Sequence, residues 1–197
     1  MGNVFSGGKQ SLYLTNGGTE AFIDVLMPAV TDLADAMWDF RFAALLSLQD
    51  QQVMGRGAVG FDLHDIAWGA TARERARSKD FVLRATTLAL SRHRWNELGY
   101  TPSSVHGHLR QFEPMVESFA PAHGPDLATS FPGPDERAIA SCSRHRILSA
   151  LPLWGTGASC ATGERVDADR PLIPAARMPR PPVVFVSAAR GFGRPRG

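Results

Sequence analysis

Histidine and aspartate side chains are the residues of this sequence that could hold a metal ion or move a proton. Asp62 and His64 lie in the stretch "DLHD", and His106 and His108 lie in "HGH". Helix residues two positions apart point about 200° away from each other, whereas helical ligands of one metal ion stand three or four residues apart on one face. Surface or packed histidines are therefore the preferred interpretation. An enzyme or metal site built from Asp62, His64, His93 and His106 is the alternative.

A basic cluster could instead bind an anion. Arg73, Arg75, Arg77 and Lys79 crowd the first two turns of a predicted helix, where the helix dipole disfavours cations and like charges four residues apart repel each other. An anionic partner could relieve this repulsion, because clustered cations give sequence-independent affinity for nucleic acid. However, no polar recognition helix follows after a short turn, and no aromatic residues alternate with the cations. A solvated helix face is the preferred interpretation, and weak nucleic-acid binding through Arg73–Lys79 is the alternative.

Short motifs add no catalytic residue. The stretch "GRGAVG" at 55–60 has the spacing of a dinucleotide-binding loop, but that loop works only between a strand and a helix, so a flexible connector is preferred. Cys142 and Cys160 are too few for a structural zinc site. Serine-hydrolase, zinc-protease, P-loop and dithiol motifs are missing from the sequence. We therefore assign no catalytic residue, cofactor or metal, and prefer a non-enzymatic role.

Composition and short sequence patterns bear on the source of the protein and on its cellular compartment. The net charge of +2 is too small to indicate a class of partner. Of the 21 basic residues only Lys9 and Lys79 are lysines, a bias that suggests a GC-rich bacterium. The start "MGNVFS" matches an acceptor for myristoylation of Gly2, but that modification needs a eukaryotic enzyme. No apolar run approaches the roughly 20 residues of a membrane span, and no signal segment is present. These features favour the cytoplasm.

Four predicted helices would position these side chains. They span 20–37 after a Thr19 cap, 38–54 before Gly55, 72–98 between a Thr71–Glu74 capping box and Gly99, and 105–119 after Ser103 or Ser104. Pro28 lies inside the first of them and should kink or restart it, and Pro114 should bend the last. Leu83 and Leu90 lie opposite the apolar face of the third helix, which indicates a central helix packed by several neighbours.

Apolar residues at steps of three and four predict the buried faces of these helices. For the first two helices they are Phe22, Ile23, Leu26, Val30 and Leu33, then Phe42, Leu45, Leu46 and Leu48. For the last two they are Phe81, Val82, Ala85, Leu88, Ala89 and Trp95, then Val105, Leu109, Phe112, Val116 and Phe119. The connector between the second and third helices should be pinned to the core by Phe61, Leu63, Ile66 and Trp68.

The two ends of the chain differ in character. Only three of the 14 prolines precede residue 121, and helical periodicity stops there. We therefore predict a mainly α protein, with a domain of about four helices at 10–120 and a Pro/Gly/Arg-rich, largely irregular tail at 121–197. One short strand could form at 183–186. A shifted reading frame in GC-rich DNA would also produce such a tail, which would then be a non-native extension.

A compact helical domain without catalytic motifs favours a protein–protein interaction or regulatory module. Its protein partner is not identified by the sequence. Trp38 and Trp95 would be interface anchors if the fold leaves them exposed. Nucleic-acid binding and an enzyme or metal site are the two alternatives given above.

Overall fold

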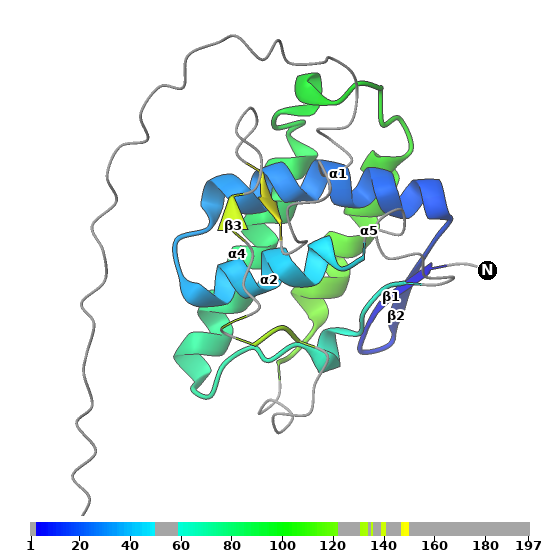
Figure 1. Ribbon diagram of the computed structural model, residues 1–197. Coiled ribbons are helices and arrows are strands. Elements are labelled where there is room, and N and C mark those ends of the chain that lie inside the picture. The colour runs from blue at the N-terminus through cyan, green and yellow to red at the C-terminus, as the bar shows by residue number, and fades with distance from the viewer. Residues whose placement is uncertain are drawn as a thin grey trace, which may run out of the picture. The chain divides into compact units, whose positions relative to one another are not determined.

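The computed structural model describes residues 3–49, 59–121, 131–133, 135, 139–140 and 147–149. Its elements are β1 (Asn3–Gly7), β2 (Gln10–Leu14), α1 (Asn16–Leu33), α2 (Met37–Ser47), the short turn η1 (Leu63–Asp65), α4 (Ala72–Leu90), the short turn η2 (Trp95–Glu97), α5 (Val105–Ser118), β3 (Ile139–Ala140) and β4 (Leu148–Ser149). The prediction of a mainly α protein with about four helices is confirmed (Figure 1). None of the described helices is long and apolar enough to cross a membrane.

The four helices share one core. Figure 1 shows α1 lying across α4 and α5, with α2 beside it, and the packing contacts agree. Each helix contributes a fully buried phenylalanine: Phe22, Phe42, Phe81 and Phe112. The rings of Phe22 and Phe112 lie 5.3 Å apart, and those of Phe42 and Phe81 lie 6.3 Å apart. Burial of each ring stabilises the fold by about 1.5–3 kcal/mol.

The sequence analysis did not predict the N-terminal hairpin. β1 pairs antiparallel with β2 around a two-residue turn, in which Gly8 takes the left-handed conformation (φ +61°) that suits glycine. Phe5, Leu12 and Leu14 point inward and are 0–3% exposed, so the hairpin closes one end of the helical core. Phe5 lies before the predicted start of the domain at residue 10, yet it belongs to the same core.

The connector after residue 58 runs beside β1. The N–H groups of Val4 and Ser6 donate to the carbonyl oxygens of Val59 and Phe61 at 3.1 and 3.0 Å. Gly60 has φ +128°, and a Cβ there would stand 1.7 Å from the Val4 oxygen, so only glycine fits this close approach. The predicted anchors of the connector are confirmed: Phe61, Leu63, Ile66 and Trp68 are at most 6% exposed.

The start of α1 differs from the prediction. The helix begins at Asn16, and the Thr15 hydroxyl caps it by accepting from the Gly18 amide at 3.1 Å. Thr19, the predicted cap, lies one turn inside, where its hydroxyl accepts from Asn3 Nδ2 at 2.7 Å. Two glycines in the first turn hide the helical pattern there, because glycine favours other conformations. The helix is not interrupted at Pro28.

The start of α4 confirms the predicted capping box. The Glu74 amide donates to Thr71 Oγ1 at 3.1 Å, and the Thr71 amide donates to Glu74 Oε2 at 2.9 Å. The predicted end at Gly99 is wrong, since α4 ends at Leu90. Helix α5 confirms its predicted apolar stripe, whose five residues are at most 5% exposed. Its cap Ser104 makes no side-chain capping bond.

Some described residues after position 120 contact the helices. Phe131 is buried, its ring stacks on Trp38 at 5.6 Å, and the Arg41 guanidinium lies over it at 4.7 Å. The Leu148 amide donates to Thr31 Oγ1 at 3.2 Å. The division of the chain at residue 120 stays a prediction, because most of 121–197 lies outside the described residues. The same holds for Gly2, Gly55, both cysteines and the strand expected at 183–186.

Candidate functional site

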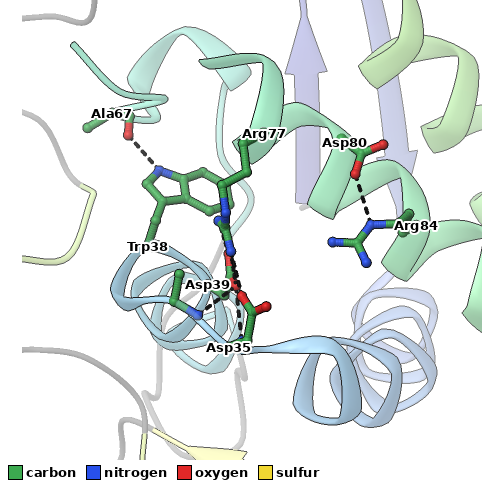
Figure 2. A network of polar contacts seen from close by, with 8 residues as sticks. Asp35, Trp38, Asp39, Ala67, Arg77, Asp80 and Arg84 are labelled. Carbon is green, nitrogen blue, oxygen red and sulfur yellow. Dashed lines mark hydrogen bonds and ion pairs between the residues drawn. The ribbon is translucent and has the colours of Figure 1, made fainter. Parts of the chain in front are cut away.

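Arg77, one of the predicted anion contacts, is held by two carboxylates. Its guanidinium forks onto Asp39, with Nη1–Oδ1 and Nη2–Oδ2 distances of 2.9 Å, and its Nη2 also lies 2.6 Å from Asp35 Oδ1. Figure 2 shows this arrangement beside the simpler Asp80–Arg84 pair on α4. Bidentate pairing fixes the planar guanidinium group, so Arg77 joins α4 to the start of α2.

Asp39 is the buried member of this network. Its side chain is fully buried, and Oδ2 also accepts from the amides of Asp35 and Ala36 at 3.1 and 3.0 Å. Burial raises the pKa of the Asp39 carboxyl, but the hydrogen bonds from Arg77 and the two amides outweigh burial and hold the pKa below its ordinary value. The same hydrogen bond with Asp39 raises the pKa of Arg77.

Two other cations of the basic helix also make intramolecular contacts. Arg75 Nη1 donates to the carbonyl oxygen of Ala70 at 2.8 Å. Lys79 Nζ donates to the carbonyl oxygens of Glu117 and Phe119 at 2.6 and 2.8 Å, where a cation is favoured at the end of α5. Arg73 is exposed. Three of the four residues predicted to contact an anion therefore bind groups of the protein itself.

The predicted histidine and aspartate ligands contact different partners. His64 Nδ1 lies 2.8 Å from Asp62 Oδ1, whereas His93 Nε2 lies 2.7 Å from Asp32 Oδ2 and His106 Nε2 lies 3.2 Å from the Leu90 carbonyl oxygen. Within the described ranges no three His, Cys, Asp or Glu side chains are grouped as a metal ion would require. These residues form separate polar contacts there.

Asp62 also binds a serine that the sequence analysis did not select. The Ser6 hydroxyl donates to Asp62 Oδ2 at 2.6 Å, on the outward side of β1. Burial raises the pKa of Asp62, but the bonds from Ser6 and His64 outweigh it and lower the pKa overall. The carboxylate lies between the hydroxyl and the imidazole, so the imidazole is not hydrogen-bonded to the serine as a base activating a nucleophile would be.

The turn after α4 is fixed by Asp32. Arg92 and Arg94 both have left-handed backbones, with φ +64° and +57°, which costs an L-residue roughly 1–2 kcal/mol. Arg94 offsets part of this cost by pairing with Asp32 at 3.0 Å and Glu97 at 2.8 Å. These contacts, together with the His93–Asp32 bond, explain why α4 ends long before the predicted Gly99.

A groove opens beside this turn, between the end of α1 and the second half of α4. It has a volume of about 450 Å³, is open to solvent, and its walls are mainly apolar. Its lining residues are Leu33, Leu83, Arg84, Thr87, Leu88 and Ser91. The sequence analysis placed Leu83, with Leu90, opposite the buried face of this helix, and it placed Leu33 and Leu88 on buried faces, whereas all three lining leucines are half-buried. Leu83 was therefore the one sequence signal for this surface, although it was interpreted as evidence of packing by neighbouring helices.

The lining residues of α4 and its C-cap residue Ser91 form two ridges. Leu83, Thr87 and Ser91 follow each other at steps of four, and so do Arg84 and Leu88. Ridges of this spacing are the surfaces on which another helix packs. The groove can therefore receive apolar side chains. Comparisons with protein-family models, curated proteins and solved structures found no match to this chain.

Proposed function

We propose that this protein is a protein-interaction module whose α1–α4 groove receives apolar side chains of a partner protein. The observation that carries the proposal is the open apolar hollow lined by Leu33, Leu83 and Leu88. Its volume of about 450 Å³ lies in the range of 300–1,000 Å³ that is usual for small-molecule pockets, so it has room for apolar side chains. The cytoplasm remains the compartment that the sequence analysis favours.

The surroundings of the groove support this function. Asp80–Arg84 and Asp32–Arg94 are ion pairs formed by residues in or next to its lining. An apolar centre within a rim of charged groups is the usual composition of a protein interface, in which the central side chains contribute most of the affinity. Trp38 and Trp95 are less suited to the role of anchor, because both pack against the core.

The alternatives have less support. Nucleic-acid binding by Arg73–Lys79 would require the side chains of Arg77 and Lys79 to leave carboxylate and carbonyl partners within the protein. An enzyme or metal site would require Asp62 and His64 to act with histidines that contact other parts of the fold. The groove needs neither change.

The proposal is tested by titrating the full chain into a labelled amphipathic peptide that carries leucine on one helical face and glutamine on the other. Burial of one leucine contributes about 1.5–3 kcal/mol, so Leu83→Ser should weaken binding roughly 10- to 100-fold. Tyr13→Ser, on the hairpin, is the matched control because this side chain is 73% exposed. Binding that is equal in wild type and Leu83→Ser would contradict the proposed groove.

A further inference from the structure

We propose that the outer edge of β2 pairs antiparallel with the same edge of a second copy of this chain. The proposal starts from the direction of the backbone groups in the hairpin. The N–H groups of Val4 and Ser6 donate to the connector after residue 58, so they point away from β2. Opposite residues of an antiparallel pair turn their backbone groups either toward each other or away from each other. Since Val4 is opposite Tyr13 and Ser6 is opposite Ser11, the N–H and C=O groups of Ser11 and Tyr13 point out from the other edge of β2.

These four backbone groups are available to a further strand. In the described part of the chain no group hydrogen-bonds to them. Proteins usually protect such an edge with a lysine, a proline or a bulge. The sequence of β2 is QSLYL, without a charge or a proline, and its register with β1 is continuous. The edge of β2 therefore lacks the features that prevent pairing.

The outward face of the hairpin is partly apolar. Tyr13 is 73% exposed, and Val4, directly opposite on β1, is 36% exposed. They are two of the four large hydrophobic residues that are exposed in the described ranges. Neither strand carries a charged side chain, so two copies of the hairpin can lie side by side without repulsion between strand residues.

The edge of β2 is complementary to itself. Ser11 and Tyr13 stand symmetrically about Leu12, so a two-fold axis at Leu12 places Ser11 of each copy opposite Tyr13 of the other. Each of these two pairs exchanges N–H···O bonds in both directions, which uses all four outward groups of each copy. The small serine leaves room for the tyrosine across the strands, and the two tyrosines become diagonal neighbours within reach of each other. Pairing with a second copy therefore satisfies the edge without any group from another protein.

The dimer should be weak, because two strands of five residues make a small interface. We expect a Kd between about 10 µM and 1 mM. The hairpin lies beside the start of α1 (Figure 1), whereas the groove lies at its end, about 27 Å along this 18-residue helix. The dimer edge and the groove can therefore be tested separately.

Sedimentation equilibrium of the full chain over this concentration range tests the dimer, which should approach twice the monomer mass. Two double variants test its register. Ser11→Lys with Tyr13→Lys places lysine opposite lysine in both pairs, whereas Ser11→Glu with Tyr13→Lys places glutamate opposite lysine. Like charges directly opposite each other destabilise strand pairing and opposite charges stabilise it. At low ionic strength the Glu/Lys variant should therefore dimerise at least tenfold more tightly than the Lys/Lys variant. Leu83→Ser, in the groove, is the control and should dimerise as the wild type does.

A second measurement needs no variant. In a mixture of isotope-labelled and unlabelled wild-type chains, NMR contacts between Ser11 of one copy and Tyr13 of the other should appear. The proposal is overturned if the wild type stays monomeric up to about 1 mM, or if the two double variants associate equally. Loss of the dimer in Leu83→Ser would also overturn it, because the groove and not β2 would then join the copies.

Discussion

Replacing Asp39 by asparagine should destabilise the fold far more than any exposed charge change. The Asp39 carboxylate accepts four hydrogen bonds: one from Arg77 at Oδ1, and one from Arg77 and two from backbone amides at Oδ2. An asparagine with its oxygen in the Oδ2 position keeps three of these bonds. Its amide nitrogen then faces the Arg77 Nη1 donor, and the negative charge is lost.

The expected loss is about 2–3 kcal/mol. Breaking a buried ion pair by removing one partner costs roughly 3–5 kcal/mol. The value here is smaller, because Arg77 is 39% exposed and keeps Asp35 as a partner, so water screens part of the change. The matched control is Asp80→Asn, which removes an exposed i,i+4 pair with Arg84 and should cost no more than about 0.5 kcal/mol.

Urea denaturation of the full chain, followed by tryptophan fluorescence, measures both variants. A shifted midpoint with an unchanged slope reports a change in stability. The reasoning is refuted if Asp39→Asn unfolds within 0.5 kcal/mol of the wild type, or if it is no more damaging than Asp80→Asn.

Three further predictions follow from the fold. The pKa of Asp39 is lowered in the folded state, so the contribution of this carboxylate to the unfolding free energy is complete above the ordinary pKa of 3.8 and is lost as pH falls through the folded value. The difference in unfolding free energy between wild type and Asp39→Asn should therefore be smaller at pH 3 than at pH 6. A constant difference would contradict this assignment. Gly60→Ala would bring a Cβ to 1.7 Å from the Val4 oxygen at φ +128°, so it should lower the unfolding free energy by at least about 2 kcal/mol. Gly107→Ala, in open space on α5, should instead raise it by about 0.5–1 kcal/mol in the same denaturation assay. Similar effects of the two changes would be inconsistent with this backbone. Thr71→Ala removes one half of the capping box and should lower the unfolding free energy by about 1 kcal/mol, whereas no change would show that the box is not formed.

Local patterns were enough to predict much of the helical fold. The stripe of α5 and the capping box at Thr71 are written in contiguous residues, and the structure places both as predicted. The hairpin was missed because its strands have only five residues each, too few for a periodic signal, although "GGK" between alternating apolar residues favours a turn. Short strands need such turn residues to be recognised.

Contacts between distant residues could not be predicted in the same way. Arg77 and Asp39 are 38 positions apart, and nothing near either residue indicates that they meet. The end of α4 depends on Asp32, which is about 60 residues away from His93 and Arg94. The groove could not be predicted for the same reason. The position of Leu83 on an outward face of its helix does not indicate whether another part of the chain covers it.

The most direct test of the proposed binding groove is a leucine-methyl NMR titration of the full chain with the amphipathic leucine–glutamine peptide. The account predicts that the methyl signals of Leu33, Leu83 and Leu88 shift in a saturable manner, while those of Leu12 and Leu14 under the hairpin stay in place. Saturable shifts confined to the hairpin leucines, with the three groove leucines unchanged, would contradict it.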